Sequence, residues 1–169
     1  CIWRHVGKGT FIASTEPKSG SGSLAELITK VTPITLMRSR LSLEPAIARE
    51  AAIHASGDAV SNLTMIGQRT QAADNWEDYE LFDDQFHRAI GIAADNPLLL
   101  SLFDHLNAVR RGVAWKTVVR SSVRPAFDHT SFAEHGQILA AIEARDPSAA
   151  HASMRTHLVS VSNRLFGDA

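Results

Sequence analysis

The chain of 169 residues is poor in cysteine and in long apolar runs. Cys1 is the only cysteine, which excludes a disulfide framework within the chain and a cysteine-based zinc site. A single thiol fits a reducing compartment, so we expect a cytoplasmic protein. No apolar run approaches the roughly 18 residues that a membrane-spanning helix needs, and no secretory signal is visible.

The chain also lacks an excess of basic charge. Its 17 Lys and Arg residues are balanced by 18 Asp and Glu residues, for a formal net charge of −1. By itself the chain is therefore a poor candidate for strong nucleic-acid binding. With 44% hydrophobic and 21% charged residues, its composition is that of an ordinary globular protein. The length is enough for one domain with a substantial core.

The first 23 residues differ from the rest of the chain. Residues 1–13 predict two short strands about the turn Val6-Gly7-Lys8-Gly9, where glycine allows the positive φ that a tight hairpin needs. Residues 14–23 are polar, with two glycines, and are expected to form a linker. The chain begins with Cys1 rather than Met inside the first predicted strand, so we expect it to be a piece of a longer protein.

From residue 24 onward the apolar spacing predicts an all-α domain, an antiparallel bundle of six to seven helices. Gly57 is expected to end the second helix and Asp58 to cap the third. Asn96-Pro97 and Asp146-Pro147 are expected to begin the fifth and the last helix. The predicted helices cover residues 24–30, 34–56, 59–74, 76–94, 97–119, 128–145 and 147–166.

Four polar residues on the apolar faces of these helices predict a divalent metal site. Asp83 and His87 are four residues apart, so they share one face of a helix. His135 and His157 each lie eleven residues from Asp146, so an antiparallel helix pair brings them to the same height. Buried polar groups need a partner, and one cation can serve all four. Imidazoles with a carboxylate suit zinc, the first candidate, or nickel, iron or manganese better than calcium.

Other interpretations of these residues remain open. A single inward-facing histidine is commonly a hydrogen-bonded core residue rather than a ligand. His105 lies near the mirror position of His87 across the Asn96-Pro97 turn and could replace one of the four, although an exposed position is also expected for it. Asp84 points about 100° away from Asp83 and is the weaker choice of ligand.

Signs of catalysis are fewer. The chain has no Gly-x-Ser-x-Gly elbow and no glycine-rich phosphate loop. A hydrolytic metal centre needs a general base, and the nearest glutamates are Glu80 and Glu134, of which Glu134 is adjacent to His135 and points off its face. We therefore expect a ligand sensor rather than an enzyme. The alternatives are a single-metal hydrolase or lyase in a helical bundle, and a zinc site that only joins helices.

The motifs of the chain resemble those of a known family. The stretch Gly7-Lys8-Gly9-Thr10-Phe11-Ile12-Ala13 resembles the wing of the winged helix-turn-helix domain in GntR-type transcription regulators. The remainder is similar to the all-helical effector-binding (FCD) domain of their FadR-like subgroup. Its markers are Arg40-x-x-Leu43-Glu44-Pro45, Asp83-x-x-Phe86-His87-x-x-Ile90, Ala94-x-Asn96-Pro97-Leu98, His135-x-x-Ile138-x-x-Ala141-Ile142 and Met154-x-x-His157-Leu158.

The resemblance implies a metal-centred binding site for a small carboxylate or sugar acid. It assigns the ligand role to Asp83, His87, His135 and His157. It also implies that Arg40 pairs with the carboxylate of the effector, a task that suits the guanidinium fork. An ion pair with Glu44 is the alternative for Arg40. The pocket is expected to be lined by three further residues, Trp115, Arg111 and Arg124. For Trp115, packing in the core is the alternative.

The same resemblance implies a division of the chain and a set of partners. Residues 1–13 would be the remnant of the wing, 14–23 a linker and 24–169 the effector-binding domain. The domain is expected to form a homodimer, for which the family suggests the first and fourth helices. DNA would be bound only through the missing N-terminal domain, with Arg4 and Lys8 touching phosphates in the complete protein.

Overall fold

The computed structural model describes residues 2–5, 9–12, 23–113 and 122–167. At its N-terminal end two short strands, β1 (Ile2–His5) and β2 (Gly9–Ile12), pair antiparallel. Ile2 lies opposite Ile12 and His5 opposite Gly9. The predicted turn residues 6–8, with Lys8, and the linker residues 14–22 lie outside the described residues.

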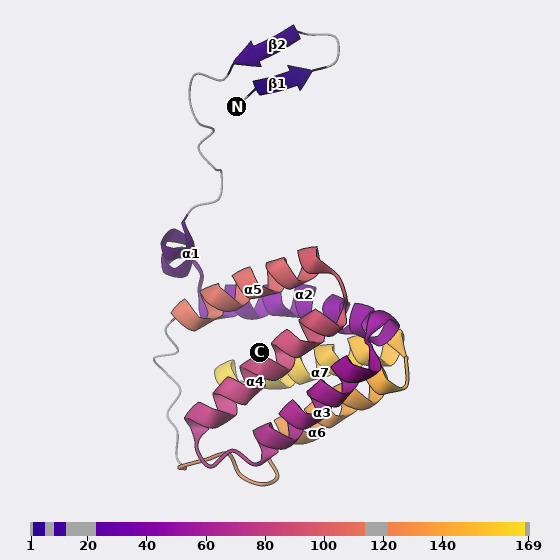
Figure 1. Cartoon of the computed structure of the whole chain (residues 1–169). Helices are drawn as coiled ribbons and strands as arrows, with labels where there is room; N and C mark the ends of the chain where they lie inside the picture. Colours follow the sequence, from indigo (N-terminus) through magenta and orange to yellow (C-terminus); the bar gives the residue numbers. More distant parts are fainter. Residues whose placement is uncertain (1, 6–8, 13–22, 114–121, 168–169) are drawn as a thin grey trace.

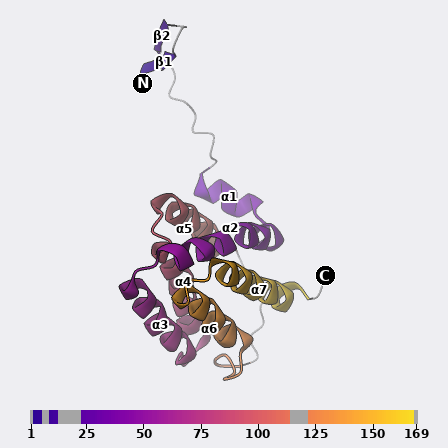
Figure 2. The same cartoon turned by 90° about the vertical axis from the view of Figure 1, so that its right-hand side faces the viewer.

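The rest of the described chain is helical, and the predicted all-α fold is confirmed (Figure 1). Helix α7 packs against α2 and α6, and α3 packs against α4 and α6, as Figure 2 shows from the side. Helix α5 lies across α2 and α4 and also contacts α1. The helices are α1 (Leu24–Lys30), α2 (Pro33–His54), α3 (Gly57–Gln71), α4 (Trp76–Ala93), α5 (Pro97–Gly112), α6 (Thr130–Glu143) and α7 (Pro147–Phe166).

Two of the predicted helix starts are confirmed. The side chain of Asn96 accepts hydrogen bonds from the backbone N–H groups at the start of α5, and Pro97 is its first residue. Asp146 does the same for α7, which begins at Pro147. A side-chain acceptor followed by proline suits a helix start, because the first N–H groups have no partner within the helix.

The boundary between α2 and α3 differs from the prediction. Helix α2 ends at His54, and Gly57 is the first residue of α3 rather than the end of α2. Ser56, not Asp58, caps α3, since its Oγ accepts a hydrogen bond from Ala59 N at 3.1 Å. The serine hydroxyl supplies the acceptor two residues earlier. Asp58 then lies in the first turn, where a carboxylate favours the helix dipole.

The end of α5 also differs from the prediction of a helix to residue 119. The helix ends at Gly112, and Val113 is extended with φ −72° and ψ 118°. A side chain at position 112 would collide with Ile28 of α1, so glycine permits the close approach of α1 to α5. Residues 114–119 lie outside the described residues.

The apolar core lies between α2, α3, α4, α6 and α7. Its largest fully buried side chains include Phe86, Ile90, Ile138, Met154 and Leu158. They recur at helical spacing on the same faces as the predicted metal ligands, so burial of these faces also brings the polar residues inside. Among the described helices, none combines the length and the apolar character needed to cross a membrane.

Candidate metal centre and effector pocket

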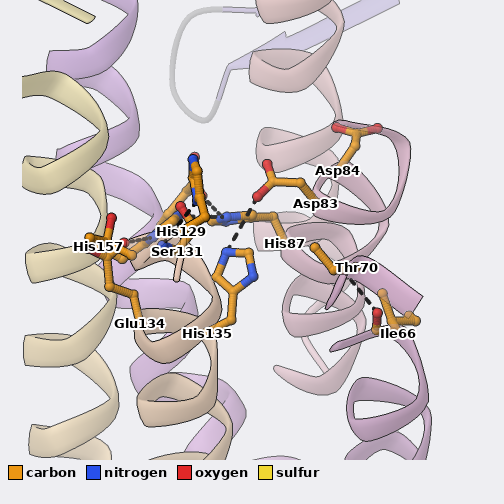
Figure 3. A network of polar contacts seen from close by, with 12 residues as sticks. Ile66, Thr70, Asp83, Asp84, His87, His129, Ser131, Glu134, His135 and His157 are labelled. Carbon is orange, nitrogen blue, oxygen red and sulfur yellow. Dashed lines mark hydrogen bonds and ion pairs between the residues drawn. The ribbon is translucent and has the colours of Figure 1, made fainter. Parts of the chain in front are cut away.

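The structure brings the four predicted ligands together at the centre of the bundle. Asp83 and His87 project from α4, His135 from α6 and His157 from α7 (Figure 3). One donor atom from each residue lies within 4.8 Å of the other three, and the three histidines are buried. The four side chains could therefore hold a metal ion.

Two pairs of donor atoms face one another in this cluster. The Nε2 atoms of His87 and His157 are 3.2 Å apart, and His135 Nε2 lies 3.4 Å from Asp83 Oδ1. Donor atoms on one ion with bonds of about 2.1 Å are separated by roughly 3–4 Å, which is close to this spacing. Facing ring nitrogens suit a shared cation, since each can then direct a lone pair at it.

Two of the histidines have a carboxylate on their other ring nitrogen. Glu44 Oε2 lies 2.6 Å from Nδ1 of His87, and Glu134 Oε2 lies 2.8 Å from Nδ1 of His157. A metal-binding histidine usually donates this N–H to a carboxylate or carbonyl, which sets the tautomer and turns Nε2 toward the ion. The hydrogen bond from Glu134 thus prepares His157 to act as a ligand, and Glu44 lies at ion-pair distance from Nδ1 of His87.

His135 has no such carboxylate. Its ring stacks on Phe86 with centroids 4.5 Å apart, and neither ring nitrogen makes a hydrogen bond to any described residue. Leaving a buried polar atom without a partner costs free energy, so this ring is a site where a cation would be favourable. The cluster therefore fits a divalent metal by its donor set and by its unpartnered nitrogen.

The charges of the cluster also suit a cation. Burial raises the pKa of Asp83, but the attraction of the three histidines lowers it by more. The pKa of Asp83 is therefore about 2, below its usual value. Burial lowers the pKa of His135 to about 3, and it lowers the pKa of His157 as well, although Glu134 partly opposes this. At neutral pH the carboxyl group is thus ionised and these two rings are neutral, which is the state that binds a metal.

The lowered pKa of His135 predicts that the metal-free protein loses stability in mild acid. Unfolded histidine titrates near 6.5 and His135 in the folded chain at about 3. Between these values the unfolded chain binds more protons, so the free energy of unfolding falls by about 1 kcal/mol for each pH unit below about 6.5. Urea unfolding of the chelator-treated protein at about pH 7.5 and about pH 5.5 measures the slope.

In that comparison His135→Asn should reduce the slope, and the contribution of His157, whose pKa burial also lowers, should remain. His105→Asn, at an exposed position of α5, should leave it unchanged. Equal slopes in the two variants would contradict the assignment of this titration to His135.

A small cavity opens beside the cluster, between α2, α4 and α5. Its volume is about 10 Å³, room for about one water molecule. Arg40, Asp83 and His87 line it together with Asn107 and Arg110 of α5. Arg40 is buried and its Nε lies 2.5 Å from Glu44 Oε1, so it both forms the ion pair and borders the cavity. The strong attraction to Glu44 outweighs burial and raises the pKa of Arg40.

Arg110, which was not predicted from the sequence, reaches the cavity, whereas the predicted residues Arg111 and Arg124 do not line it. Arg110 Nη2 pairs with Asp84, and Arg110 Nε donates to Asn107 Oδ1 at 2.8 Å. Arg111 is 61% exposed and lies 3.2 Å from Asp84. Arg124 packs over Phe127 with its guanidinium carbon 4.1 Å from the ring centroid. The predicted residue Trp115 lies outside the described residues, as does the side chain of the predicted DNA contact Arg4.

The remaining alternatives from the sequence do not join the cluster. His105 is exposed, and Asp84 is paired with arginines instead of facing the histidines. Sequence reasoning missed the roles of Glu44 and Glu134 beside the histidines, and of Asn107 and Arg110 at the cavity. For these residues the sequence offered one signal, the spacing of four between Arg40 and Glu44, which indicates an ion pair along one helix.

Comparison with known proteins places the chain in a family. The FCD domain model matches residues 35–160. The Uxu operon regulator of Haemophilus influenzae is 29% identical over 163 residues, which are 95% of this chain and 60% of that protein. The HTH-type transcriptional repressor NanR of Salmonella arizonae is 31% identical over 128 residues, 73% of this chain and 46% of that protein. The chain thus spans about half of each curated relative.

Two solved structures share the fold. Streptococcus agalactiae GntR superposes with a TM-score of 0.61 at 24% identity, covering 95% of this chain and 73% of that one. E. coli McbR/YncC has a TM-score of 0.69 at 19% identity, covering 80% of this chain and 66% of that one. Because the FCD model matches most of the bundle, including all four residues of the cluster, the chain belongs to the FCD domain family.

Proposed function

We propose that this chain is the effector-sensing and dimerisation domain of a bacterial transcription regulator, and that its effector is a small organic acid or sugar acid bound at a metal centre. The observation that carries the proposal is the buried cluster of one carboxylate and three imidazoles beside a cavity bordered by Arg40. The names of the two curated relatives, a regulator and a repressor, support a sensor over an enzyme.

In this proposal the metal is held by Asp83, His87, His135 and His157. When bound, the ion supplies a positive Lewis-acid centre that favours a carboxylate oxygen. Zinc remains the first candidate, with nickel, iron and manganese as alternatives. Glu134 keeps the ring of His157 in the tautomer that a metal requires, and the carboxylate of Glu44 lies 2.6 Å from Nδ1 of His87.

The arginines of the cavity would recognise the effector. Arg40 is fixed by Glu44, so its guanidinium is already oriented at low entropic cost. Arg110 is held by Asp84 and Asn107, and the cavity has room for about one water molecule. An effector therefore enters by displacing Arg110 from Asp84, and the carboxylate of the effector then replaces that of Asp84.

In the complete protein, binding of the effector would change the affinity for DNA. We propose that residues 1–13 belong to a winged helix domain, that 14–23 link it to the sensor, and that 24–169 form the dimerising unit. A dimer holds two DNA-reading domains at a fixed spacing, which must match two half-sites. The effector can favour one arrangement of the dimer over another only if it binds the two arrangements with different affinities.

The effector site predicts a difference between neighbouring arginines. In the metal-loaded protein, Arg110→Ala should weaken the binding of small carboxylates by about 10- to 100-fold, because a charged hydrogen bond is lost. Arg111→Ala serves as the matched control, since Arg111 is more exposed and does not line the cavity. Thermal shift with a panel of hydroxy acids and sugar acids measures this, as a ligand stabilises the folded state by mass action.

Three results of that panel separate the proposed sensor from its rivals. Saturable stabilisation without chemical change of the acid supports the sensor. Turnover of an acid by the metal-loaded protein would favour the single-metal hydrolase or lyase. A metal-loaded protein that no carboxylate stabilises would indicate a metal site that only joins helices.

A further inference from the structure

Arg164, in the last turn of α7, lies at the outer end of a chain of polar contacts that leads to the metal cluster. Its Nη1 donates hydrogen bonds to the hydroxyl oxygens of Thr130 and Ser160, and its Nη2 donates to Ser131 Oγ at 2.8 Å. Nη1 also lies 3.7 Å from Oε1 of Glu134, at ion-pair distance. Three neutral acceptors therefore fix the guanidinium group where it faces one carboxylate.

The carboxylate of Glu134 divides its two oxygens between Arg164 and the cluster. Oε1 faces Arg164, whereas Oε2 lies 2.8 Å from Nδ1 of His157, and Figure 3 shows Glu134 beside that ring. Helical spacing produces this arrangement, because His157, Ser160 and Arg164 share one face of α7. Ser131 and Glu134 likewise share the face of α6 that packs against α7.

His157 differs from the other two histidines of the cluster in the partner of its Nδ1. Toward the described residues, Nδ1 of His87 and both ring nitrogens of His135 make no hydrogen bond. Nδ1 of His157 has Glu134 as its partner. This contact places the proton on Nδ1 and leaves the lone pair of Nε2 for an ion. The orientation of His157 therefore depends on what holds Glu134.

We propose that Arg164 is a positioning residue of the metal centre. It fixes the carboxylate of Glu134, which in turn fixes the tautomer and the ring orientation of His157. The effect on metal affinity rests on the proposed function, whereas the contacts from Arg164 to His157 are present without a metal. Arg164 also repels a cation, but its side chain is 34% exposed, so solvent screens this repulsion and the orientation of Glu134 is the larger effect.

The alternative role for Arg164 is to join the end of α7 to the start of α6. Its hydrogen bonds to Thr130 and Ser131 would do this, and a cation near the C-terminal end of a helix is favourable in itself. A joining role affects only the stability of the fold. A positioning role also changes the hydrogen bond of the His157 ring, so the test measures that ring directly.

The first measurement follows the ring N–H of His157 by NMR in the metal-free protein. We expect a proton on Nδ1 that exchanges slowly with water, because its hydrogen bond to Glu134 protects it. Arg164→Met keeps the length of the side chain but removes its charge and donors. It should speed the exchange by about three- to tenfold, the equivalent of about one hydrogen bond. Arg155→Met, at an exposed position of α7, is the control and should leave the exchange unchanged.

Zinc affinity, measured by competition with a chromogenic chelator, tests whether Arg164 acts through Glu134. Arg164→Met should weaken zinc binding by about three- to tenfold, less than Glu134→Ala does, because it acts one contact further from the ring. In the Glu134→Ala background the same change should have no effect, since the connecting carboxylate is gone. Arg164→Lys retains the charge beside Glu134 and should recover most of the affinity.

The outcomes separate this inference from the proposed function. Faster exchange of the His157 ring proton in metal-free Arg164→Met would support the inference even if the protein took up no zinc, and the metal centre alone would then fail. Unchanged exchange and unchanged zinc affinity, with only a lower Tm, would overturn it and leave a residue that joins two helices. A loss of zinc affinity that persists in full without Glu134 would also overturn it.

Discussion

Replacing Glu44 by alanine is expected to lower the free energy of unfolding by about 3–5 kcal/mol, although it removes none of the proposed metal ligands. Glu44 is 3% exposed and touches both Arg40, at 2.5 Å, and His87 Nδ1, at 2.6 Å. These two contacts outweigh burial and hold the pKa of Glu44 well below its usual range. Without the carboxylate, the guanidinium of Arg40 remains buried without its partner, and that desolvation is the main cost.

Urea unfolding of the metal-free protein measures this loss. Glu50→Ala is the matched control, because Glu50 lies on the same helix and pairs with Arg49 at the surface, where an ion pair contributes about 0–1 kcal/mol. Glu44→Gln keeps the shape and one acceptor and should fall between the two alanine variants. Similar losses for Glu44→Ala and Glu50→Ala would show that the buried contacts of Glu44 with Arg40 and His87 do not stabilise the fold.

Replacing His157 by alanine is expected to weaken zinc binding by more than about 100-fold. His157 would supply one of four ligand atoms, and even the loss of an outer partner of a ligand costs about 10- to 100-fold in affinity. Glu134→Ala should therefore show the smaller, 10- to 100-fold effect, since it removes the carboxylate 2.8 Å from His157 Nδ1. The order of the two variants tests the ligand and its support separately.

Competition with a chromogenic zinc chelator gives these affinities. His151→Ala is the control on the same helix, because His151 is exposed and lies outside the cluster. Circular dichroism of each variant ensures that lost binding is not lost folding. An affinity unchanged by His157→Ala would remove this residue from the metal site.

The sequence was sufficient for features that depend on a single helix or on one helix pair. The spacing of four places Asp83 and His87 on one face. The equal distances of His135 and His157 from Asp146 predicted that the two residues lie at the same height. They do so because α6 and α7 pack antiparallel, and the two ring centroids are 4.7 Å apart. The caps at Asn96 and Asp146 follow from local chemistry alone.

Features that depend on how several helices pack could not be predicted. Glu134 was expected to point off the face of His135, which is correct for one helix, but α7 brings His157 to that side. Likewise Arg110 and Arg111 are adjacent in sequence, and only the position of α5 against α4 decides which of them borders the cavity. The cap at Ser56 instead of Asp58 was a choice between two good acceptors.

The most direct test of the metal centre is the metal content of the purified protein, measured by elemental analysis before and after mild chelation. We predict about one equivalent of a divalent transition metal per chain, restored by adding metal to the chelated protein and absent in His157→Ala. Protein that is free of metal and takes up none on addition would contradict the proposed centre.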